Sequence, residues 1–408
     1  MSLAQHASLV QMKRINLSVF LFVLFISLPA SAALPSLVDW MQSLVDEGKV
    51  VGCAAQVTKG GETIFLEAFG DRSPRSEEDL STDQIVRIYS MSKAITSTAI
   101  MQLVEQGKLG IDDPVSMYIP EFAEMTVGLG EEARPARRQI TIRDLLTHTS
   151  GLAYDFSAPE AYKVAYVEVF EKTPTLESAG VAMGSLPLIS DVGERFVYGV
   201  STDVLGRVVE VVSGVPFEEY LRGHIFGPLK MTHTGFAPPP DLKPMHIVTG
   251  EPGALDIDAA HYASENFRAL KPRFQSGGGG LWSTLGDYTR FMQAIENFGE
   301  LDGVRILKSK TVAFMTQNQL SPAYLSSQRF GWGFGLQAPV ITSVGPRGGG
   351  RWTWGGAAST YFFIDPNQDL TAIFVTQKFP FDGPLGEAFH RVVLESVAVE
   401  VPSQAGSQ

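Results

Sequence analysis

The spacing of apolar residues predicts helices and strands at both ends of this chain. Near the start, apolar residues recur at the spacing of one buried helix face, at Leu37, Trp40, Met41, Leu44 and Val45. The runs VGCAAQV (51–57) and ETIFLEAFG (62–70) are typical of strands, and the KGG between them is typical of a hairpin turn. Far downstream, TYFFID (360–365) and LTAIFVTQ (370–377) flank another turn, and LGEAFHRVVLESVAV (385–399) has a helical pattern.

The middle of the chain has a different pattern, with helical segments separated by connectors rich in proline and glycine. These segments include TIRDLLTH (141–148), STDVLGRVVEVV (201–212) and PFEEYLRGHIF (216–226). The pattern predicts an α/β fold in which an antiparallel sheet, flanked by helices, is built from both chain ends, about residues 33–110 and 275–400. A mostly helical region, about residues 111–274, would form the other wall of a cleft within one catalytic domain spanning 33–400.

The first 32 residues have the pattern of a secretory signal. Lys13 and Arg14 precede an apolar run over residues 16–28, and the small residues Ala30, Ser31 and Ala32 follow. Cleavage after Ala32 would give a secreted or periplasmic protein. The alternative, an uncleaved anchor, requires about 18 or more apolar residues. Since this run is shorter, we expect no stable membrane span after cleavage.

Composition excludes several classes of protein. With 44% hydrophobic and 19% charged residues, the 408-residue chain is expected to be globular, and its net charge of −12 argues against a nucleic-acid partner. Cys53 is the single cysteine, so no internal disulfide can form, and its apolar surroundings predict a packing role. The histidines lack the HExxH spacing, and Gly277–Gly280 lack the GK[ST] of a phosphate-binding loop. We therefore expect no metal and no cofactor.

The segment IYSMSKAITSTAIMQLVEQG (88–107) carries candidate chemistry. It places Ser90 at the head of a helix, and Lys93 three residues later lies one turn away on the same face. A serine hydroxyl becomes a good nucleophile when a neighbouring base takes its proton, and a partly desolvated lysine can assist. The same SxxK spacing also arises by chance on surface helices.

Six segments resemble, in the same order, the serine hydrolases that comprise class C β-lactamases, low-molecular-weight penicillin-binding proteins and family VIII carboxylesterases. They are YSMSK (89–93), TIRDLLTHTSGL (141–152), FVYGVSTDVLG (196–206), FGPLKMTHTGF (226–236), GGGGLWSTLGDYTRFM (277–292) and WGGAASTYFFIDP (354–366). The resemblance implies a β-lactamase/DD-peptidase-like fold and a catalytic set of Ser90, Lys93 and Tyr198. Whether Lys93 or Tyr198 takes the first proton is left open by the sequence.

Two departures from the lactamase pattern bear on the substrate. Val200 stands where the YxN motif has its asparagine, and Trp354 stands where KTG has its lysine. The resemblance places Gly355 and Gly356 against bound substrate, and makes the N–H of Ala357 a candidate oxyanion donor together with that of Ser90. Trp354 is either a binding residue or a packing residue, and Arg347 or Arg351 is a candidate replacement for the missing cation.

The sequence therefore predicts a serine hydrolase that forms an acyl-enzyme on Ser90, most like a family VIII carboxylesterase acting on small esters. A DD-peptidase or β-lactamase acting on amides or β-lactams, an acyltransferase, and a catalytically silent penicillin-binding-like sensor are the alternatives. The chain has no GxSxG, which argues against an α/β-hydrolase. His148 could suggest a Ser–His pair, but we expect a structural role in a helix capped by Thr141 and Asp144 and stopped at Gly151.

Overall fold

A seven-stranded antiparallel sheet forms the centre of the computed structural model, which describes residues 34–259, 274–322, 331–338 and 350–400. The strand order is β11-β12-β13-β14-β15-β1-β2. Its long strands are β1 (Gly52–Lys59), β2 (Glu62–Gly70), β13 (Trp352–Gly356), β14 (Thr360–Asp365) and β15 (Leu370–Val375), with β11 (Gly331–Trp332) and β12 (Gln337–Ala338) at one edge. β1 pairs with β15 from Ala54–Val375 to Lys59–Leu370, which confirms the predicted sheet from both chain ends.

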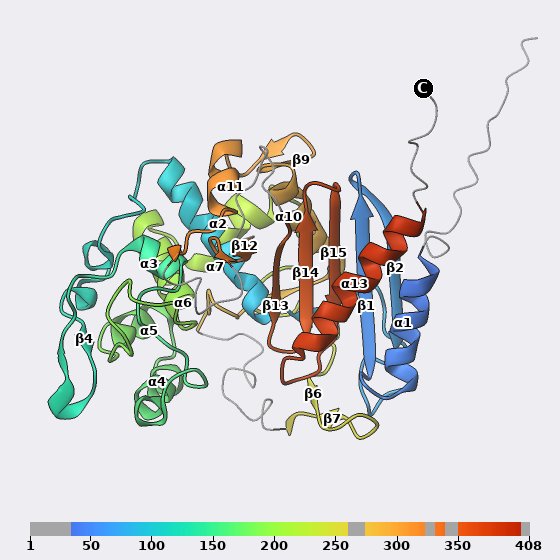
Figure 1. The fold of residues 1–408 in the computed structure, drawn as a ribbon, viewed down its shortest axis with the longest axis horizontal. Coiled ribbons are helices and arrows are strands. Elements are labelled where there is room, and N and C mark those ends of the chain that lie inside the picture. Colours follow the sequence, from blue (N-terminus) through green and yellow to red (C-terminus); the bar gives the residue numbers. More distant parts are fainter. Residues whose placement is uncertain (1–33, 260–273, 323–330, 339–349, 401–408) are drawn as a thin grey trace, which may run out of the picture.

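Helices α1 (Pro35–Asp46) and α13 (Gly383–Glu400) cover one face of this sheet (Figure 1). The predicted apolar stripe of α1 places Leu37, Met41 and Leu44 in a buried cluster with Phe374 of β15 and Phe389 of α13. Alternate residues of each strand point to opposite faces, so Phe374 faces these helices while its neighbours Ile373 and Val375 belong to a second, larger cluster.

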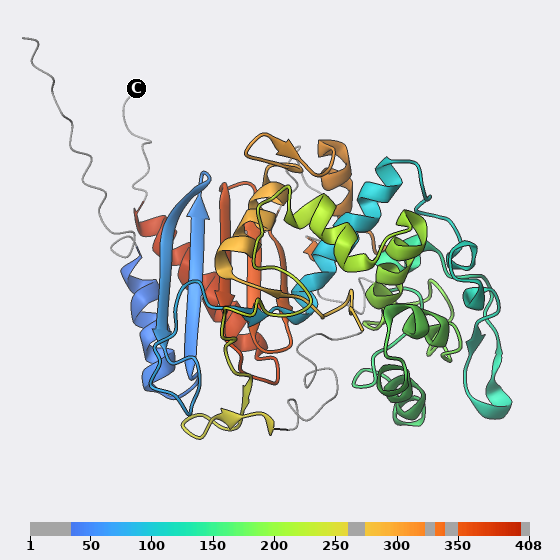
Figure 2. The same cartoon turned by 180° about the vertical axis from the view of Figure 1, so that it is seen from behind.

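The second cluster joins the opposite face of the sheet to the helical region. Helix α10 (Leu285–Glu296) lies across this face, as Figure 2 shows from behind. Helix α2 (Ser92–Glu105) is buried along almost its whole length and packs against α6 (Ser201–Ser213). Because α2 carries small and apolar residues on all sides, it can be surrounded by other elements.

The middle of the chain is mostly helical and lies beside the sheet (Figure 1). It contains α3 (Ile142–Leu146), α4 (Glu160–Lys172), α5 (Leu176–Met183), α6 and α7 (Phe217–Leu221), with two short strand pairs, β4 (Thr126–Val127) with β5 (Arg134–Pro135) and β6 (Val248–Thr249) with β7 (Asp256–Ile257). Beyond it follow β9 (Glu300–Leu301), β10 (Val304–Arg305) and α11 (Ser309–Met315).

One short strand pair positions the candidate site. β3 (Val86–Arg87) pairs with β8 (Trp282–Ser283), which brings the segment before Ser90 alongside the segment that follows Gly277–Gly280. The N–H of Ile88 also donates to the carbonyl of Leu281 at 3.0 Å. Two segments about 190 residues apart in the sequence are thereby joined.

The structure also bears on smaller predictions. Cys53 is buried in the α1–α13 cluster, and burial raises the pKa of its thiol, in accord with a packing role.

Thr141 and Asp144 form the predicted capping box, but α3 ends at Leu146, five residues before Gly151. The helix stops early because the chain turns at His148, which has a φ of 55°.

Among the residues that the structure describes, none of the helices has the length and apolar character needed to cross a bilayer. The predicted signal, residues 1–32, lies outside the described residues, as does Arg347.

Candidate active site

Ser90 lies in a sharp turn between β3 and α2. The turn is a single 3₁₀ segment, Tyr89–Met91, and Tyr89 has a φ of 44°, a conformation that is costly for a residue other than glycine. The Tyr89 ring is buried beneath the Arg87 guanidinium, whose carbon lies 4.7 Å from the ring centroid. This packing holds the strained turn and leaves the Ser90 side chain half-buried at the entry of α2.

The Lys93 side chain is fully buried and reaches three oxygen atoms. Its Nζ donates to Ser90 Oγ at 3.3 Å, to Tyr154 Oη at 3.0 Å and to the Gly278 carbonyl at 2.7 Å. An ammonium group has three N–H donors, so these three acceptors satisfy it completely. The predicted approach of Lys93 to Ser90 along one helix face is present in the structure.

Tyr198 approaches Ser90 from the segment that enters α6. Its Oη lies 2.7 Å from Ser90 Oγ, and its ring centroid lies 4.6 Å from Lys93 Nζ. Gly199, the next residue, is required by close packing, because a Cβ there would lie 2.1 Å from the Leu152 carbonyl oxygen. The structure thus brings together the three side chains that the sequence predicts, Ser90, Lys93 and Tyr198.

Strand β13 forms a further wall of the site. Trp354 packs edge-on against Trp332, with ring centroids 4.5 Å apart, and its Nε1 donates to Tyr198 Oη at 3.4 Å. A Cβ on Gly356 would lie 2.4 Å from the Ile88 carbonyl oxygen, so this glycine allows β13 to lie directly against the segment that leads to Ser90. Ala357 follows at the strand end and packs with the cluster that contains Tyr89.

Two site residues were not found by the sequence analysis, Tyr154 and Asp203. Tyr154 lies in the loop after the THTSGL segment and contacts Lys93, as described above. Asp203 lies in the first turn of α6 with no exposed surface, and accepts from Tyr154 Oη at 3.4 Å, from the Gly278 N–H at 3.1 Å and from Ser276 Oγ. In sequence alone, Asp203 is indistinguishable from an ordinary acidic residue at a helix start.

Burial shapes the protonation of both groups. Burial, and then the charge of Asp203, raise the pKa of Tyr154 well above its ordinary value, so this phenol stays protonated. Burial also raises the pKa of Asp203, while the Lys93 charge and the three hydrogen bonds act in the opposite direction. The neutral phenol of Tyr154 therefore connects the buried Lys93 side chain to the buried carboxyl group of Asp203.

A known family matches most of this chain. The model of the family described as Beta-lactamase covers residues 37–395. The chain belongs to the β-lactamase family.

Relatives within the β-lactamase family are similar over most of their length. Protein Rv1367c of Mycobacterium tuberculosis is 33% identical over 359 residues, which cover 83% of this chain and 89% of the relative. Lovastatin esterase of Penicillium rubens is 30% identical over 381 residues, which cover 84% and 93%. The solved structure of the hydrolase EstCE1 superposes with a TM-score of 0.76 at 24% identity, covering 88% of this chain and 97% of EstCE1, and it supports the fold.

This member of the β-lactamase family has a buried apolar residue where an asparagine is found in the YxN motif. Val200 is fully buried at the start of α6 and presents no amide to the site. Tyr154, from a different loop, supplies a polar contact to Lys93.

His148 lies behind Tyr198 rather than beside Ser90. It is buried, packs against the rings of Tyr198 and Trp332 at 5.0 and 5.4 Å, and its Nδ1 accepts the N–H of Gly199 at 3.4 Å. Burial and the Lys93 charge lower the pKa of His148, so the imidazole is neutral. Its position is that of a support for the Tyr198 ring, in accord with the structural role expected from the sequence.

The glycines at 277–280 lie in a turn beside the site. Gly278 supplies its carbonyl to Lys93 and its N–H to Asp203. A Cβ on Gly278 would lie 2.5 Å from Tyr154 Oη, so glycine is required there. Within the described ranges, no three His, Cys, Asp or Glu side chains gather as a metal site would need.

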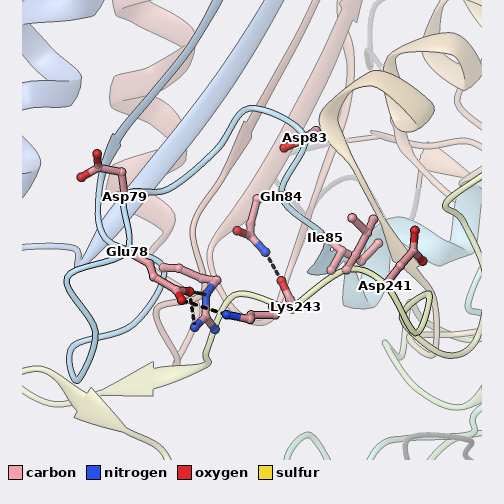
Figure 3. Close-up of a pocket in the computed structure, with 9 residues that line it drawn as sticks. Glu78, Asp79, Asp83, Gln84, Ile85, Asp241 and Lys243 are labelled. Atoms are coloured by element: carbon pink, nitrogen blue, oxygen red, sulfur yellow. Dashed lines mark hydrogen bonds and ion pairs between the residues drawn. The ribbon is translucent and has the colours of Figure 1, made fainter.

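A separate surface pocket of about 180 Å³ lies before β3, lined by Arg72, Glu78 and Lys243 among others (Figure 3). Both cations pair with Glu78, at 2.9 and 2.8 Å. Glu78 and Lys243 are exposed, so these contacts form a surface ion-pair network, which contributes little to stability.

Proposed function

We propose that this enzyme is a serine hydrolase that forms an acyl-enzyme on Ser90 and acts as a carboxylesterase on small esters. The observation that carries this proposal is the approach of two proton-transferring groups to one hydroxyl, Tyr198 Oη at 2.7 Å and Lys93 Nζ at 3.3 Å from Ser90 Oγ. The similarity to lovastatin esterase supports an ester as the substrate.

The reaction has two halves. Ser90 Oγ attacks the ester carbonyl while its proton passes to the Lys93–Tyr198 pair, and the pair returns a proton to the departing alcohol. The N–H groups of Ser90 and Ala357 are the proposed donors to the tetrahedral oxyanion, a device worth about 10² to 10³ in rate per donor. Water then attacks the acyl-enzyme, the acid is released and Ser90 regains its proton.

A neutral substrate is favoured by the side chains around Ser90. Trp354 offers an indole where a β-lactam or peptide carboxylate would need a cation. Arg351, the candidate replacement, lies 6.0 Å from the Phe363 ring and lines a groove with His390 of α13. Phe363 belongs to the cluster on the α1–α13 face, whereas Trp354 packs with the cluster on the opposite face, so Arg351 does not replace the missing cation at Ser90.

The test is the mass of the intact protein after incubation with p-nitrophenyl acetate. We expect one added acetyl group on the wild type and none on Ser90→Ala. Ser116→Ala, at a half-buried serine outside the site, is the matched control and should be acylated. An unlabelled wild type would favour a binding or sensor role, and faster turnover of a chromogenic cephalosporin than of the ester would favour a β-lactamase. An added alcohol that captures the acyl group in place of water would reveal an acyltransferase.

The same assay tests the two proton-transferring residues. Lys93→Ala and Tyr198→Phe should each lower the acylation rate by about 10² or more, as expected for loss of general acid–base catalysis. Tyr162→Phe, on α4, is the control and should acylate at the wild-type rate. An unchanged rate in either site variant would remove that residue from the mechanism.

For location, we propose secretion or a periplasmic destination, with the catalytic domain spanning residues 33–400. The pattern of residues 13–32 supports this, and cleavage after Ala32 would leave α1 intact, because this helix begins at Pro35. N-terminal sequencing of the mature protein from the producing cell should give Ala33 as its first residue. A retained Met1 would argue for an anchored or unexported chain.

A further inference from the structure

The environment of Lys93 raises the question of what balances its charge. The side chain is fully buried, and a buried ammonium is costly unless it has hydrogen bonds and a partner of opposite charge. Its three contacts, Ser90 Oγ, Tyr154 Oη and the Gly278 carbonyl, are all uncharged acceptors. The countercharge must therefore lie one step further away.

Asp203 supplies that countercharge through Tyr154. Since Tyr154 Oη accepts from Lys93, its own proton is free to be donated onward, and Asp203 Oδ2 lies 3.4 Å away. The other carboxylate oxygen, Oδ1, accepts from Ser276 Oγ and from the Gly278 N–H. A carboxyl group that receives three donors is satisfied in its ionised form, because the protonated form would itself have to donate.

We propose that Tyr154 and Asp203 are a positioning pair, in which Tyr154 fixes the Lys93 ammonium beside Ser90 and the Asp203 carboxylate sets the pH range over which Ser90 is activated. The inference rests on the proposed function and adds two residues to it. Gly278 connects both ends of the arrangement, because its carbonyl binds Lys93 and its N–H binds Asp203. Lys93 and Asp203 are thus connected twice, through the Tyr154 side chain and through the backbone of Gly278.

Other charged or titratable groups also face Lys93, Tyr154 and Asp203. His148 and Tyr198 lie near Lys93, Asp155 lies near Tyr154, and Arg87 of β3 donates to the Gly279 carbonyl at 3.4 Å. His148 is neutral, as described above. Asp203 is the fully buried carboxylate among these groups, so its removal changes the local charge most strongly.

The direction of the effect follows from electrostatics alone. Loss of a buried negative charge favours the deprotonated form of neighbouring groups, whichever of Lys93 and Tyr198 takes the first proton. In Asp203→Asn, the acidic limb of the kcat/KM profile should therefore move to lower pH, by about one pH unit. Asparagine can keep the bonds from Gly278 and Ser276 through its carbonyl oxygen and can donate to Tyr154 Oη.

The matched control is Asp287→Asn. Asp287 is likewise a buried aspartate in the first helical turn, here of α10, and accepts from the His233 N–H at 2.7 Å. This variant carries the general cost of replacing a buried aspartate and should leave the position of the acidic limb unchanged.

Tyr154→Phe separates positioning from charge. It removes the contact to Lys93 while Asp203 keeps its charge, so we expect a fall in kcat/KM of about tenfold or more, seen mainly in the acylation rate. Tyr361→Phe is the control, because Tyr361 is a buried tyrosine of the α1–α13 cluster, on the other face of the sheet, and its Oη donates to the Asp382 carbonyl. Circular dichroism at each pH verifies that every variant is folded.

The outcomes separate this inference from the proposed function. If the wild type is not acylated on Ser90, the proposed function fails. If it is acylated, but Asp203→Asn shows the same acidic limb as the wild type and Asp287→Asn, the countercharge role is overturned. Should Asp203→Asn fail to fold, Tyr154→Phe decides, and a wild-type acylation rate in that variant would overturn the pair.

Discussion

Trp354 is the residue at which this site departs most clearly from one that binds a carboxylate. Its indole N–H donates to Tyr198 Oη at 3.4 Å and its ring packs against Trp332. The side chain therefore supports Tyr198, the proposed catalytic tyrosine, and stands at the sequence position where the KTG motif has its lysine. A change at Trp354 should therefore affect both the charge of the preferred substrate and the position of Tyr198.

Trp354→Lys should weaken the support of Tyr198 and favour a negatively charged substrate. Loss of the hydrogen bond, worth about 1 kcal/mol, lowers ester kcat/KM about fivefold, and the new cation raises the cephalosporin-to-ester ratio about tenfold. The measurement is kcat/KM for p-nitrophenyl acetate and a chromogenic cephalosporin. Trp354→Met is the control, since it loses the N–H and gains no charge. Equal ratios in the two variants would show that charge at this position does not select the substrate.

The sequence predicted those neighbours of Ser90 that follow from local spacing or from a motif. Ser90 and Lys93 are three residues apart and lie one turn apart at the entry of α2, and the motif around Tyr198 predicted the third side chain. Tyr154 and Asp203 were missed because their environment is created by distant segments. Asp203 is buried by the turn at Gly278, 75 residues later in the chain, and no local pattern encodes that contact.

At the scale of elements, α13 is tied to the sheet by a histidine. His390 Nε2 lies 3.3 Å from Thr353 Oγ1 of β13, and its ring packs edge-on against Phe363 of β14, 4.7 Å away. Burial, with a smaller contribution from the Arg351 charge, lowers the pKa of His390 to about 4. The contact between helix and sheet therefore depends on a neutral imidazole.

This histidine should make folding pH-dependent. In the unfolded chain, His390 becomes protonated as the pH falls below the ordinary histidine pKa of about 6.5. In the folded protein it stays neutral until about pH 4. The unfolded state therefore binds more protons in this range, and the free energy of unfolding decreases as the pH falls. From pH 7 to 5 the loss from this group is about 2 kcal/mol. Urea unfolding at both pH values should show a smaller loss in His390→Gln than in wild type or His233→Gln. If His390→Gln lost as much free energy of unfolding between pH 7 and 5 as the wild type does, His390 would not be the source of this pH dependence.

Elements with strong patterns were predicted well, and weak ones were not. The hairpin of β1 and β2, and the strands β14 and β15, follow from long apolar runs. The pair β3–β8 has two residues in each strand and shows no alternation that a sequence pattern could reveal. The end of α3 was misplaced because His148, rather than a glycine, adopts the left-handed conformation.

The sheet separates two hydrophobic clusters with different roles. The α1–α13 cluster lies on one face, and the cluster that includes α2, α6 and Trp354 lies on the other. Phe389 is fully buried in the former, with its ring 5.3 Å from that of Phe374. Damage to this cluster should affect stability and leave the chemistry at Ser90 unchanged.

Phe389→Ala tests this separation. A cavity in place of a buried phenylalanine lowers the free energy of unfolding by about 3 to 5 kcal/mol. Below the melting temperature, kcat/KM for the ester should stay within about twofold of the wild type, whereas Phe314→Ala, on the exposed side of α11, should change stability much less. A large fall in kcat/KM of folded Phe389→Ala would show that the two faces are coupled.

The pairing of β1 with β15 has a consequence for synthesis on the ribosome. Residues 52–70 emerge early and can form their hairpin, but the open edge of β1 finds its partner only when residues 370–375 have been translated. Until then the nascent chain exposes an unpaired strand, which invites aggregation or capture by chaperones. A product that terminates before residue 370 lacks the strand that joins both halves of the sheet, so we expect such a fragment to be inactive.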